Sequence, residues 1–255
     1  MSPTALNTVL EVTGLNRSFG ALVVANAIDF TLEPGARHAL IGPNGAGKTT
    51  FVNLLTGRLA PSSGRIALAG EDITHLSQAE RVKRGMGRTF QINQLFKGLS
   101  VLENVVMAVA EREGRAGDMF RVAGSGRALI EEAYALLETL GIAEDALKPA
   151  REVPYGRQRL IEIALALALK PRVLLLDEPA AGVPQGESRI ILDVVAALPA
   201  DIAVLIIEHD MDIVFRFAKR ITVLVQGAIL VEGTPQQIAA DPRVREVYLG
   251  ERDHG

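Results

Sequence analysis

The sequence of 255 residues contains no cysteine. This absence excludes disulfide scaffolds, thiolate metal sites and cysteine nucleophiles. The sequence also lacks an excess of basic residues, since its formal net charge is −3. Domains that bind mainly a nucleic-acid backbone usually carry such an excess, so the charge argues against nucleic acid as a partner.

Long apolar runs are missing as well. The most apolar window, 160–169, is short and contains Glu162, so it predicts a core helix and no membrane span. Residues 1–7 show no basic flank followed by an apolar run, and we expect no secretory signal there. With 48% apolar and 22% charged residues, the composition is that of a globular protein that can bury a sizeable core. If the protein works at a membrane, we expect it to dock onto another chain that spans it.

The first part of the sequence shows two kinds of periodicity. Short apolar runs separated by turns predict β-strands over 9–35 and again over 65–69. Helical spacing begins at Val101, and a second apolar stripe is predicted from Ile130, Leu136, Leu137 and Leu140. The glycine-rich segment 112–126 between these helices is predicted to be a flexible linker.

In the second part, strands and helices alternate. The predicted strands are 173–176 and 203–207, the predicted helices are 187–197 and 211–217, and 221–225 and 229–232 form a predicted hairpin around Gly227. Alternation of this kind predicts a parallel sheet flanked by helices.

A glycine-rich loop separates a predicted strand, 37–41, from a predicted helix, 48–57. Glycines let the backbone fold around a phosphate, and the positive end of the helix faces the same anion. Lys48 can reach the β- and γ-phosphates, and the hydroxyl of Thr49 can ligate Mg²⁺. A chance glycine-rich turn would not have this strand and helix on its two sides. The loop fits G-x-x-x-x-G-K-[ST] and predicts a nucleotide site made of Gly42, Pro43, Asn44, Gly45, Ala46, Gly47, Lys48, Thr49 and Thr50.

An unbroken apolar strand, 173–176, ends in the two carboxylates Asp177 and Glu178. A central parallel strand is buried on both faces, and its carboxyl end opens where α/β sheets bind ligands. We expect Asp177 to help hold Mg²⁺ through water and Glu178 to act as the general base on the attacking water. A solvated acidic turn is the ordinary alternative, and the phosphate loop upstream argues against it.

With both motifs in place, the chain resembles the ATPases of ABC transporters over essentially its whole length. The resemblance implies that Phe19 stacks on adenine, that Gln91 senses Mg²⁺ and water between two lobes, and that His209 contacts the γ-phosphate. It implies an α/β fold with a P-loop NTPase core, mainly a parallel sheet with flanking helices, together with an antiparallel β-subdomain. The implied division of the single domain, 1–255, is a helical lobe at about 92–165 inserted within a core of 8–91 and 166–235, followed by a helical tail at 236–255.

The family's signature segment contacts the ATP held by a second subunit. In this sequence it corresponds to Pro154, Tyr155, Gly156 and Arg157, of which only Gly156 and the following helix fit well. Pro154 offers neither a hydroxyl nor a backbone N–H where the family has serine. Arg157 stands where the family has glutamine, and our hypothesis is that it supplies a positive charge. The segment 180–184, with Pro184 where a polar residue is usual, corresponds to the part that communicates between the two ATP sites.

Several phrases resemble the longer ATPase of branched-chain and hydrophobic amino-acid importers, among them those at 88–91, 101–105, 177–182, 208–211 and 248–250. The resemblance implies ATP and Mg²⁺ as cofactors and a location at the cytoplasmic face of the inner membrane. It implies a second ATPase subunit, the same or different, two membrane-spanning permeases and, indirectly, a periplasmic or extracellular solute-binding protein. Leu95, Phe96 and Leu99 are candidates either for permease contact or for ordinary lobe core.

Other members of the same superfamily remain to be weighed. ATPases of DNA repair or chromosome structure need a long coiled-coil insertion, ribosome-acting members normally carry two cassettes, and an inactive scaffold would lack Lys48 or Glu178; none of these fits. The ATPase of an exporter is the main alternative. The cargo also stays open, since urea, amides or aromatic acids are possible substrates of such an importer.

Overall fold

The computed structural model describes residues 8–89, 95–115 and 126–249. Contacts between Cα atoms divide the chain into two compact units, which are described separately. The first unit comprises 1–86, 172–178 and 199–255, and the second comprises 87–171 and 179–198. The helical lobe predicted at about 92–165 falls in the second unit, which extends further to include 179–198.

The larger sheet has the strand order β10-β9-β3-β8-β7-β6. Strands β3, β7, β8 and β9 run parallel, and β10 returns antiparallel to β9, which confirms the predicted parallel sheet and its hairpin. Strands β3, β7 and β8 are buried at every residue, as expected for strands covered on both faces. The strands are β3 (Arg37–Ile41), β6 (Met86–Arg88), β7 (Val173–Asp177), β8 (Ala203–Ile207), β9 (Arg220–Val225) and β10 (Ala228–Gly233).

A smaller antiparallel sheet has the order β2-β1-β4-β5, and β1 and β2 confirm the strands predicted over 9–35. Its apolar face shares one core with α1 and the larger sheet, for example through Phe30 and Phe51, whose rings meet edge to face at 5.5 Å. The strands are β1 (Leu10–Phe19), β2 (Leu22–Leu32), β4 (Ser63–Leu68) and β5 (Glu71–Asp72). The helices of this unit are α1 (Lys48–Thr56), α2 (Gln78–Lys83), α7 (Met211–Phe217), α8 (Pro235–Ala240) and α9 (Pro242–Leu249).

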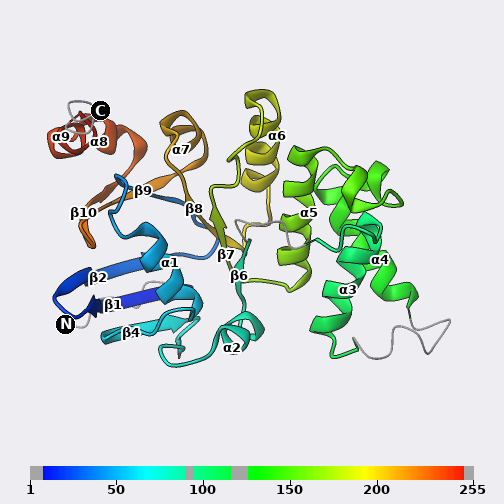
Figure 1. Ribbon diagram of the computed structural model, residues 1–255, viewed down its shortest axis with the longest axis horizontal. Coiled ribbons are helices and arrows are strands. Elements are labelled where there is room, and N and C mark those ends of the chain that lie inside the picture. The colour runs from blue at the N-terminus through cyan, green and yellow to red at the C-terminus, as the bar shows by residue number, and fades with distance from the viewer. Residues whose placement is uncertain (1–7, 90–94, 116–125, 250–255) are drawn as a thin grey trace. The chain divides into compact units, whose positions relative to one another are not determined.

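The second unit is helical, and α3, α4 and α5 pack against one another in it (Figure 1). The stripe predicted for α4 is confirmed at Leu137 and Leu140, which are buried, and wrong at Ile130, which is exposed; the helix buries Leu129 and Ala133 instead. The sequence holds apolar residues at both 129 and 130, and the packing of α4 selects the first. The helices are α3 (Val101–Arg112), α4 (Arg127–Thr139), α5 (Tyr155–Ala168) and α6 (Gln185–Ala196). Among the described residues, no helix combines the length and the apolar character that a membrane span requires.

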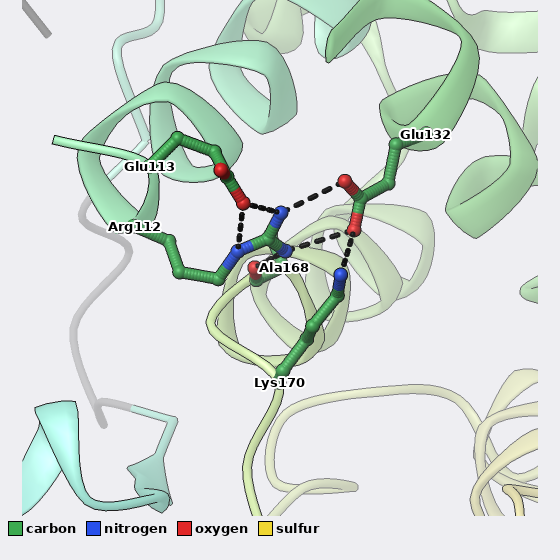
Figure 2. A network of polar contacts seen from close by, with 5 residues as sticks. All are labelled: Arg112, Glu113, Glu132, Ala168 and Lys170. Atoms are coloured by element: carbon green, nitrogen blue, oxygen red, sulfur yellow. Dashed lines mark hydrogen bonds and ion pairs between the residues drawn. The ribbon is translucent and has the colours of Figure 1, made fainter. Parts of the chain in front are cut away.

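The start of the predicted linker 112–126 is ordered structure. Arg112 is the last residue of α3, and its guanidinium donates two hydrogen bonds to the carboxylate of Glu132 in α4, both 2.8 Å long. The same group donates to the backbone oxygen of Ala168 at the end of α5, at 2.7 Å, and Lys170 completes the network (Figure 2). These contacts raise the pKa of Arg112 and lower that of Glu132 to about 2. Residues 116–125 of the predicted linker lie outside the described residues.

A buried polar chain crosses the larger sheet in the first unit. His38 in β3 is almost fully buried, and its Nε2 lies 2.8 Å from the hydroxyl of Thr222 in β9. That hydroxyl donates to the carboxylate of Glu232 in β10 at 2.9 Å, so its proton is committed and Nε2 of His38 acts as the donor. Burial is the main cause that lowers the pKa of His38 from 6.5 to about 4. The folded state therefore holds His38 neutral at physiological pH.

We expect His38 to make the protein less stable in mild acid. Between about pH 6.5 and pH 4 the unfolded chain binds a proton at this residue and the folded chain does not, so lowering the pH favours unfolding. The loss between pH 7.5 and pH 5 should be about 2 kcal/mol. Urea unfolding at both pH values measures it. His38→Gln should remove this part of the pH dependence, and the exposed His75→Gln should not; equal slopes for the two variants would contradict the assignment.

Candidate functional site

The predicted site residues of the first unit follow three neighbouring strands. The phosphate loop follows β3, the acidic pair ends β7, and His209 follows β8. Strand β8 pairs in parallel with both β3 and β7, so the carboxyl ends of all three strands lie at one edge of the sheet. The structure thus brings together groups that are far apart in the sequence, at the edge where α/β sheets bind ligands.

The phosphate loop has the geometry of an anion cradle. It ends at Gly47, which precedes α1 in a left-handed conformation with φ of 102° and gives the helix no side-chain cap. The first amides of α1 therefore face outward at its positive end, where they can bind phosphate oxygens. The ammonium of Lys48 folds back over the loop and donates to the backbone oxygens of Gly42 and Pro43. The predicted members Asn44, Gly45 and Thr49 are exposed on this loop.

Close backbone contacts hold the loop in place. A Cβ atom on Gly42 would lie 2.1 Å from the backbone oxygen of Leu224 in β9, and one on Gly47 would lie 2.9 Å from that of Val24. The backbone N–H of Gly227, in the β9–β10 turn, donates to the oxygen of Ala46 at 2.8 Å. Glycine is therefore required at 42 by the close approach of another strand.

Glu178 and His209 lie close together at the ends of β7 and β8. Oε1 of Glu178 lies 3.5 Å from Nδ1 of His209, and the backbone N–H of Glu178 donates to the oxygen of Ile207 at 2.9 Å. Glu178 has a φ of 47°, a region that residues other than glycine seldom occupy and that often marks a functional position. Asp177, one residue earlier, is nearly buried, whereas Glu178 and His209 keep solvent access.

Two neighbours fix the position of His209. Its backbone N–H donates to the carboxylate of the buried Glu208 at 3.3 Å. Asp210 then caps α7, accepting hydrogen bonds from the N–H groups of Asp212 and Ile213. The imidazole is consequently held between the end of a buried strand and the start of a capped helix, with its ring turned to solvent.

Phe19 ends β1 with its side chain half exposed. The guanidinium of Arg17 lies 4.4 Å from the centre of its ring, which is a cation–π contact. Gln91 lies outside the described residues, so its position in the site stays a prediction.

The predicted Mg²⁺ ligands have suitable chemistry. The hydroxyl of Thr49 and the carboxylate of Asp177 are hard oxygen donors of the kind that Mg²⁺ prefers. The described residues contain no group of three or more His, Cys, Asp and Glu side chains that could hold a metal. Magnesium in nucleotide sites relies on one or two protein ligands and on the phosphates, so the present donor set fits such an ion.

The predicted signature segment opens α5 in the second unit. Pro154 precedes the helix without a side-chain cap, so the first amides of α5 are open at its positive end. The hydroxyl of Tyr155 accepts a hydrogen bond from Arg159 at 2.8 Å, and the Tyr155 ring lies beside Gly182 of the 180–184 segment. The signature and the communicating segment therefore touch each other within this unit.

Arg157 has two partners inside the same unit. Its guanidinium forms ion pairs with Glu144 and with Asp145, whose side chain is almost fully buried and also receives Lys148. This pairing was not predicted from the sequence. Its only sign there is the adjacent acidic residues Glu144 and Asp145, in a turn of mixed composition outside the motif that contains Arg157. These two carboxylates neutralise the charge of Arg157 within its own unit, which argues against the hypothesis that Arg157 supplies a free positive charge to a partner's site.

A comparison with protein-family models matches residues 25–181 to the family described as ABC transporter. The chain belongs to this family. As an ABC family member it is an ATP-binding cassette, that is, a nucleotide-binding ATPase of the P-loop class. Residues 228–254 additionally match the model described as branched-chain amino acid ATP-binding cassette transporter.

Curated ABC proteins resemble the chain over almost its full length. The high-affinity branched-chain amino acid transport ATP-binding protein BraF of Pseudomonas aeruginosa is 39% identical, and the match covers 95% of this chain and 98% of BraF. LivG of Escherichia coli K12, of the same description, is 38% identical with the same coverage. A probable branched-chain amino acid transport ATP-binding protein LivG of Archaeoglobus fulgidus is 34% identical over 96% of both chains.

Solved ABC structures share the fold. The ADP conformation of MJ1267, an ATP-binding cassette of an ABC transporter, gives a TM-score of 0.83 at 31% identity, covering 95% of this chain and 99% of that one. A nucleotide-free ATP-binding cassette from an ABC transporter gives 0.82 at 31% identity, over 94% and 98% of the two chains. The expected fold class and family are thereby confirmed.

Replacing Gly42 by alanine should disrupt nucleotide binding without unfolding the protein. The new Cβ would meet the oxygen of Leu224, and the strain of about 1–3 kcal/mol has to be relieved by moving the loop. Titration with a fluorescent ADP analogue should show at least about a tenfold loss of affinity. Gly70→Ala is the control, because Gly70 also has a positive φ but open space around it. Wild-type affinity in the Gly42 variant would contradict the tight fit.

Proposed function

We propose that this ABC ATPase powers the import of a small solute, namely a branched-chain or other hydrophobic amino acid, through partner permeases. The proposal is carried by the complete phosphate loop together with the contact between Glu178 and His209 at the adjacent strand ends. The cargo class is taken from the descriptions of BraF and LivG, which match over nearly all of this chain.

ATP binds at the edge formed by β3, β7 and β8 in this proposal. The amides at the start of α1 and the ammonium of Lys48 hold the phosphates, and the half-exposed ring of Phe19 stacks on adenine. Thr49 and, through water, Asp177 hold Mg²⁺, with Gln91 as the further predicted ligand. When bound, the metal ion neutralises charge on the β- and γ-phosphates.

Hydrolysis is assigned to the pair at the ends of β7 and β8. Glu178 accepts a proton from the attacking water and orients it in line with the γ-phosphate. His209, 3.5 Å away, donates a hydrogen bond to the γ-phosphate as its negative charge shifts during transfer. Both side chains keep solvent access, so water and nucleotide can reach them.

A second ATPase subunit completes each site. We infer that the amino end of α5, with Pro154, Tyr155, Gly156 and Arg157, contacts the nucleotide held by a partner subunit, the same chain or a sister. Support comes from the open amides of α5 and from the contact of Tyr155 with Gly182 in the communicating segment. Loss of the γ-phosphate removes contacts to both chains at once, which allows the subunits to separate.

The permeases are proposed to dock on the helical unit. A pocket of about 280 Å³ is lined by Arg88, Thr89, Phe96, Asn104 and Leu165, among others. The buried Asn104 bonds to both the N–H and the oxygen of Phe96, and so fixes the backbone that presents this exposed ring. Leu95 is buried and belongs to the lobe core, so of the predicted contact residues Phe96 fits a docking role best.

We further propose that the ATPase lies at the cytoplasmic face of the inner membrane, with a solute-binding protein on the other side of the permeases. A pull-down of the tagged chain from detergent-solubilised membranes of the native host tests it. Recovery of two multi-span permeases and a second ATPase is the expected result. Recovery of soluble partners only, or of nucleic acid, would overturn the transport assignment; permeases of an exporter would favour the alternative function.

Replacing Glu178 by glutamine should leave ATP binding intact and slow hydrolysis by about 10²–10⁴-fold, the usual contribution of a general base. The variant should also stay associated with its sister subunit in Mg-ATP, because the γ-phosphate contacts persist. Size-exclusion chromatography and phosphate release measure the two effects. The exposed Glu11→Gln serves as the control. A Glu178→Gln protein that remains monomeric with ATP and the sister subunit would argue against the composite site.

Replacing Phe96 by alanine should weaken assembly with the permeases by roughly tenfold, as expected for an exposed aromatic anchor. Nucleotide affinity of the isolated subunit should not change, because the ring belongs to the helical unit. Co-purification with the permeases at graded subunit concentrations measures the effect. Ile130→Ala is the matched control, since Ile130 is an exposed apolar residue of the same unit outside the pocket lining. Equal losses in both variants would remove the specific role of Phe96.

A further inference from the structure

Two arginines that belong to none of the family's motifs bind the carboxyl ends of two particular helices. Arg81 bonds to the last turn of α1, and Arg112 bonds to the last residue of α5. The amino ends of the same two helices carry the phosphate loop and the signature segment. Under the proposed function, these are the helices that face ATP in the chain's own site and in the partner's site.

Arg81, in α2, lies under the carboxyl end of α1 with only 1% of its surface exposed. Its Nη1 donates to the backbone oxygens of Leu54 and Leu55 at 2.6 and 2.7 Å. Nη2 donates to the oxygen of Thr74 at 2.8 Å, and Nε to that of Leu76 at 3.1 Å. The side chain thus ties the last turn of α1 to the segment between β5 and α2.

A buried guanidinium is costly unless its surroundings stabilise the charge. Each hydrogen bond described for Arg81 goes to a backbone oxygen, and burial lowers its pKa. Two of those oxygens belong to the negative end of the α1 dipole, so the helix itself supplies much of the compensating field. A cation at this end in turn favours an anion at the other end of α1, where the phosphate loop ends at Gly47.

Arg112 acts on α5 in a different way. Its Nη1 donates to the oxygen of Ala168 at 2.7 Å while the fork of the guanidinium binds Glu132 in α4 (Figure 2). Glu113 and Lys170 add one more charge of each sign, at 2.6 and 3.1 Å from Arg112 and Glu132 respectively. The charges of this network balance, so its effect on α5 is one of position: the end of the helix is fastened to α3 and α4.

The amino ends of α1 and α5 differ from those of α2, α3, α7 and α8. These four helices begin with a side-chain cap from Ser77, Ser100, Asp210 or Thr234, which uses the first amides. In α1 and α5 the preceding residues, Gly47 and Pro154, provide no such cap. Helices α4 and α6 also lack one, so an open amino end alone identifies nothing. In α1 and α5 it coincides with a nucleotide motif and an arginine at the opposite end.

We propose that Arg81 and Arg112 are positioning residues that set the two ATP-facing helices from their carboxyl ends, Arg81 for the chain's own nucleotide and Arg112 for the partner's. The assignment depends on the proposed function for the second half, since only an assembled pair of ATPases has a partner site. The proposal predicts that the two arginines affect different quantities. Loss of Arg81 changes the nucleotide affinity of the isolated subunit, whereas loss of Arg112 changes turnover in the assembly alone.

The test for Arg81 uses the full-length subunit with a fluorescent ADP analogue. Arg81→Met should raise the Kd by about three- to tenfold, the range expected for a charge at a helix terminus. Arg81→Lys, which keeps the charge, should recover part of the affinity. Arg84→Met is the control, because Arg84 follows the same short helix and pairs with Glu71 at the surface. A purely structural role would lower the melting temperature but leave the Kd of the folded fraction unchanged, which would overturn the proposal.

If Arg81→Met fails to fold, Gly57→Ala gives a second test. A Cβ at 57 would lie 2.9 Å from Nε of Arg81 and would displace the guanidinium without removing its charge. Raised Kd in this variant supports positioning. Wild-type Kd in both Gly57→Ala and Arg81→Lys would overturn it.

The test for Arg112 compares the isolated subunit with the complete assembly of sister ATPase and permeases. Arg112→Met should leave the Kd of the isolated subunit unchanged and lower the kcat of the assembly by about three- to tenfold, with KM unchanged. Arg127→Met is the control, since Arg127 forms an exposed pair with Glu131 in α4. An altered Kd in the isolated subunit, or an unaltered kcat in the assembly, would overturn the assignment. If the wild-type assembly itself failed to hydrolyse ATP, the proposed function would fall, while the Arg81 test would still stand.

Discussion

The close approach of three backbone segments at the phosphate loop is the constraint on which the rest of the site depends. Gly42 lies against the backbone of Leu224, and Gly47 against that of Val24, so strand β9 and strand β2 both press on the loop. The turn at Gly227 bonds to Ala46 from the same side. The loop that cradles phosphate is therefore built into the sheet, and its shape is fixed before any ligand arrives. Such preorganisation leaves little ordering cost for the moment of binding.

Two buried charged side chains also fix the backbone near the site. Arg81 binds backbone oxygens at the end of α1, and Glu208 accepts the N–H of His209 at the end of β8. Each would be costly to bury without partners, and each meets a backbone group at the end of a helix or strand. Glu208 lies beside His209, which contacts the γ-phosphate in the proposed function. Arg81 binds the end of α1 that is opposite to the phosphate loop. Stability and site geometry thus draw on the same contacts.

The sequence allowed much of this to be predicted, and the misses have physical reasons. Strands β7 and β8 are buried on both faces, and their unbroken apolar runs predicted them correctly. The contact between Glu178 and His209 was not predicted, because it depends on β7 and β8 being neighbours in the sheet. The prediction that Ile130 lies on the buried stripe was wrong, because the neighbouring apolar residues 129 and 130 fit the helical period about equally well and only packing determines which one is buried. The role of Arg112 could not be foreseen, since a polar residue beside glycines resembles a linker until Glu132 and Ala168 are brought to it by folding.

The predicted signature segment, 154–157, carries little net charge. Arg157 stands where the family has a neutral amide, but Glu144 and the buried Asp145 both pair with it. In the proposed function, the segment therefore brings little net positive charge to a partner's nucleotide. Pro154 contributes no N–H, and no side chain caps α5. The attraction for phosphate must then come from the amides at the start of α5, and amides act only at short range and in the correct direction. A signature of this kind depends more on the orientation of its helix than one that carries a free charge, and the fastening of the far end of α5 by Arg112 supplies that orientation.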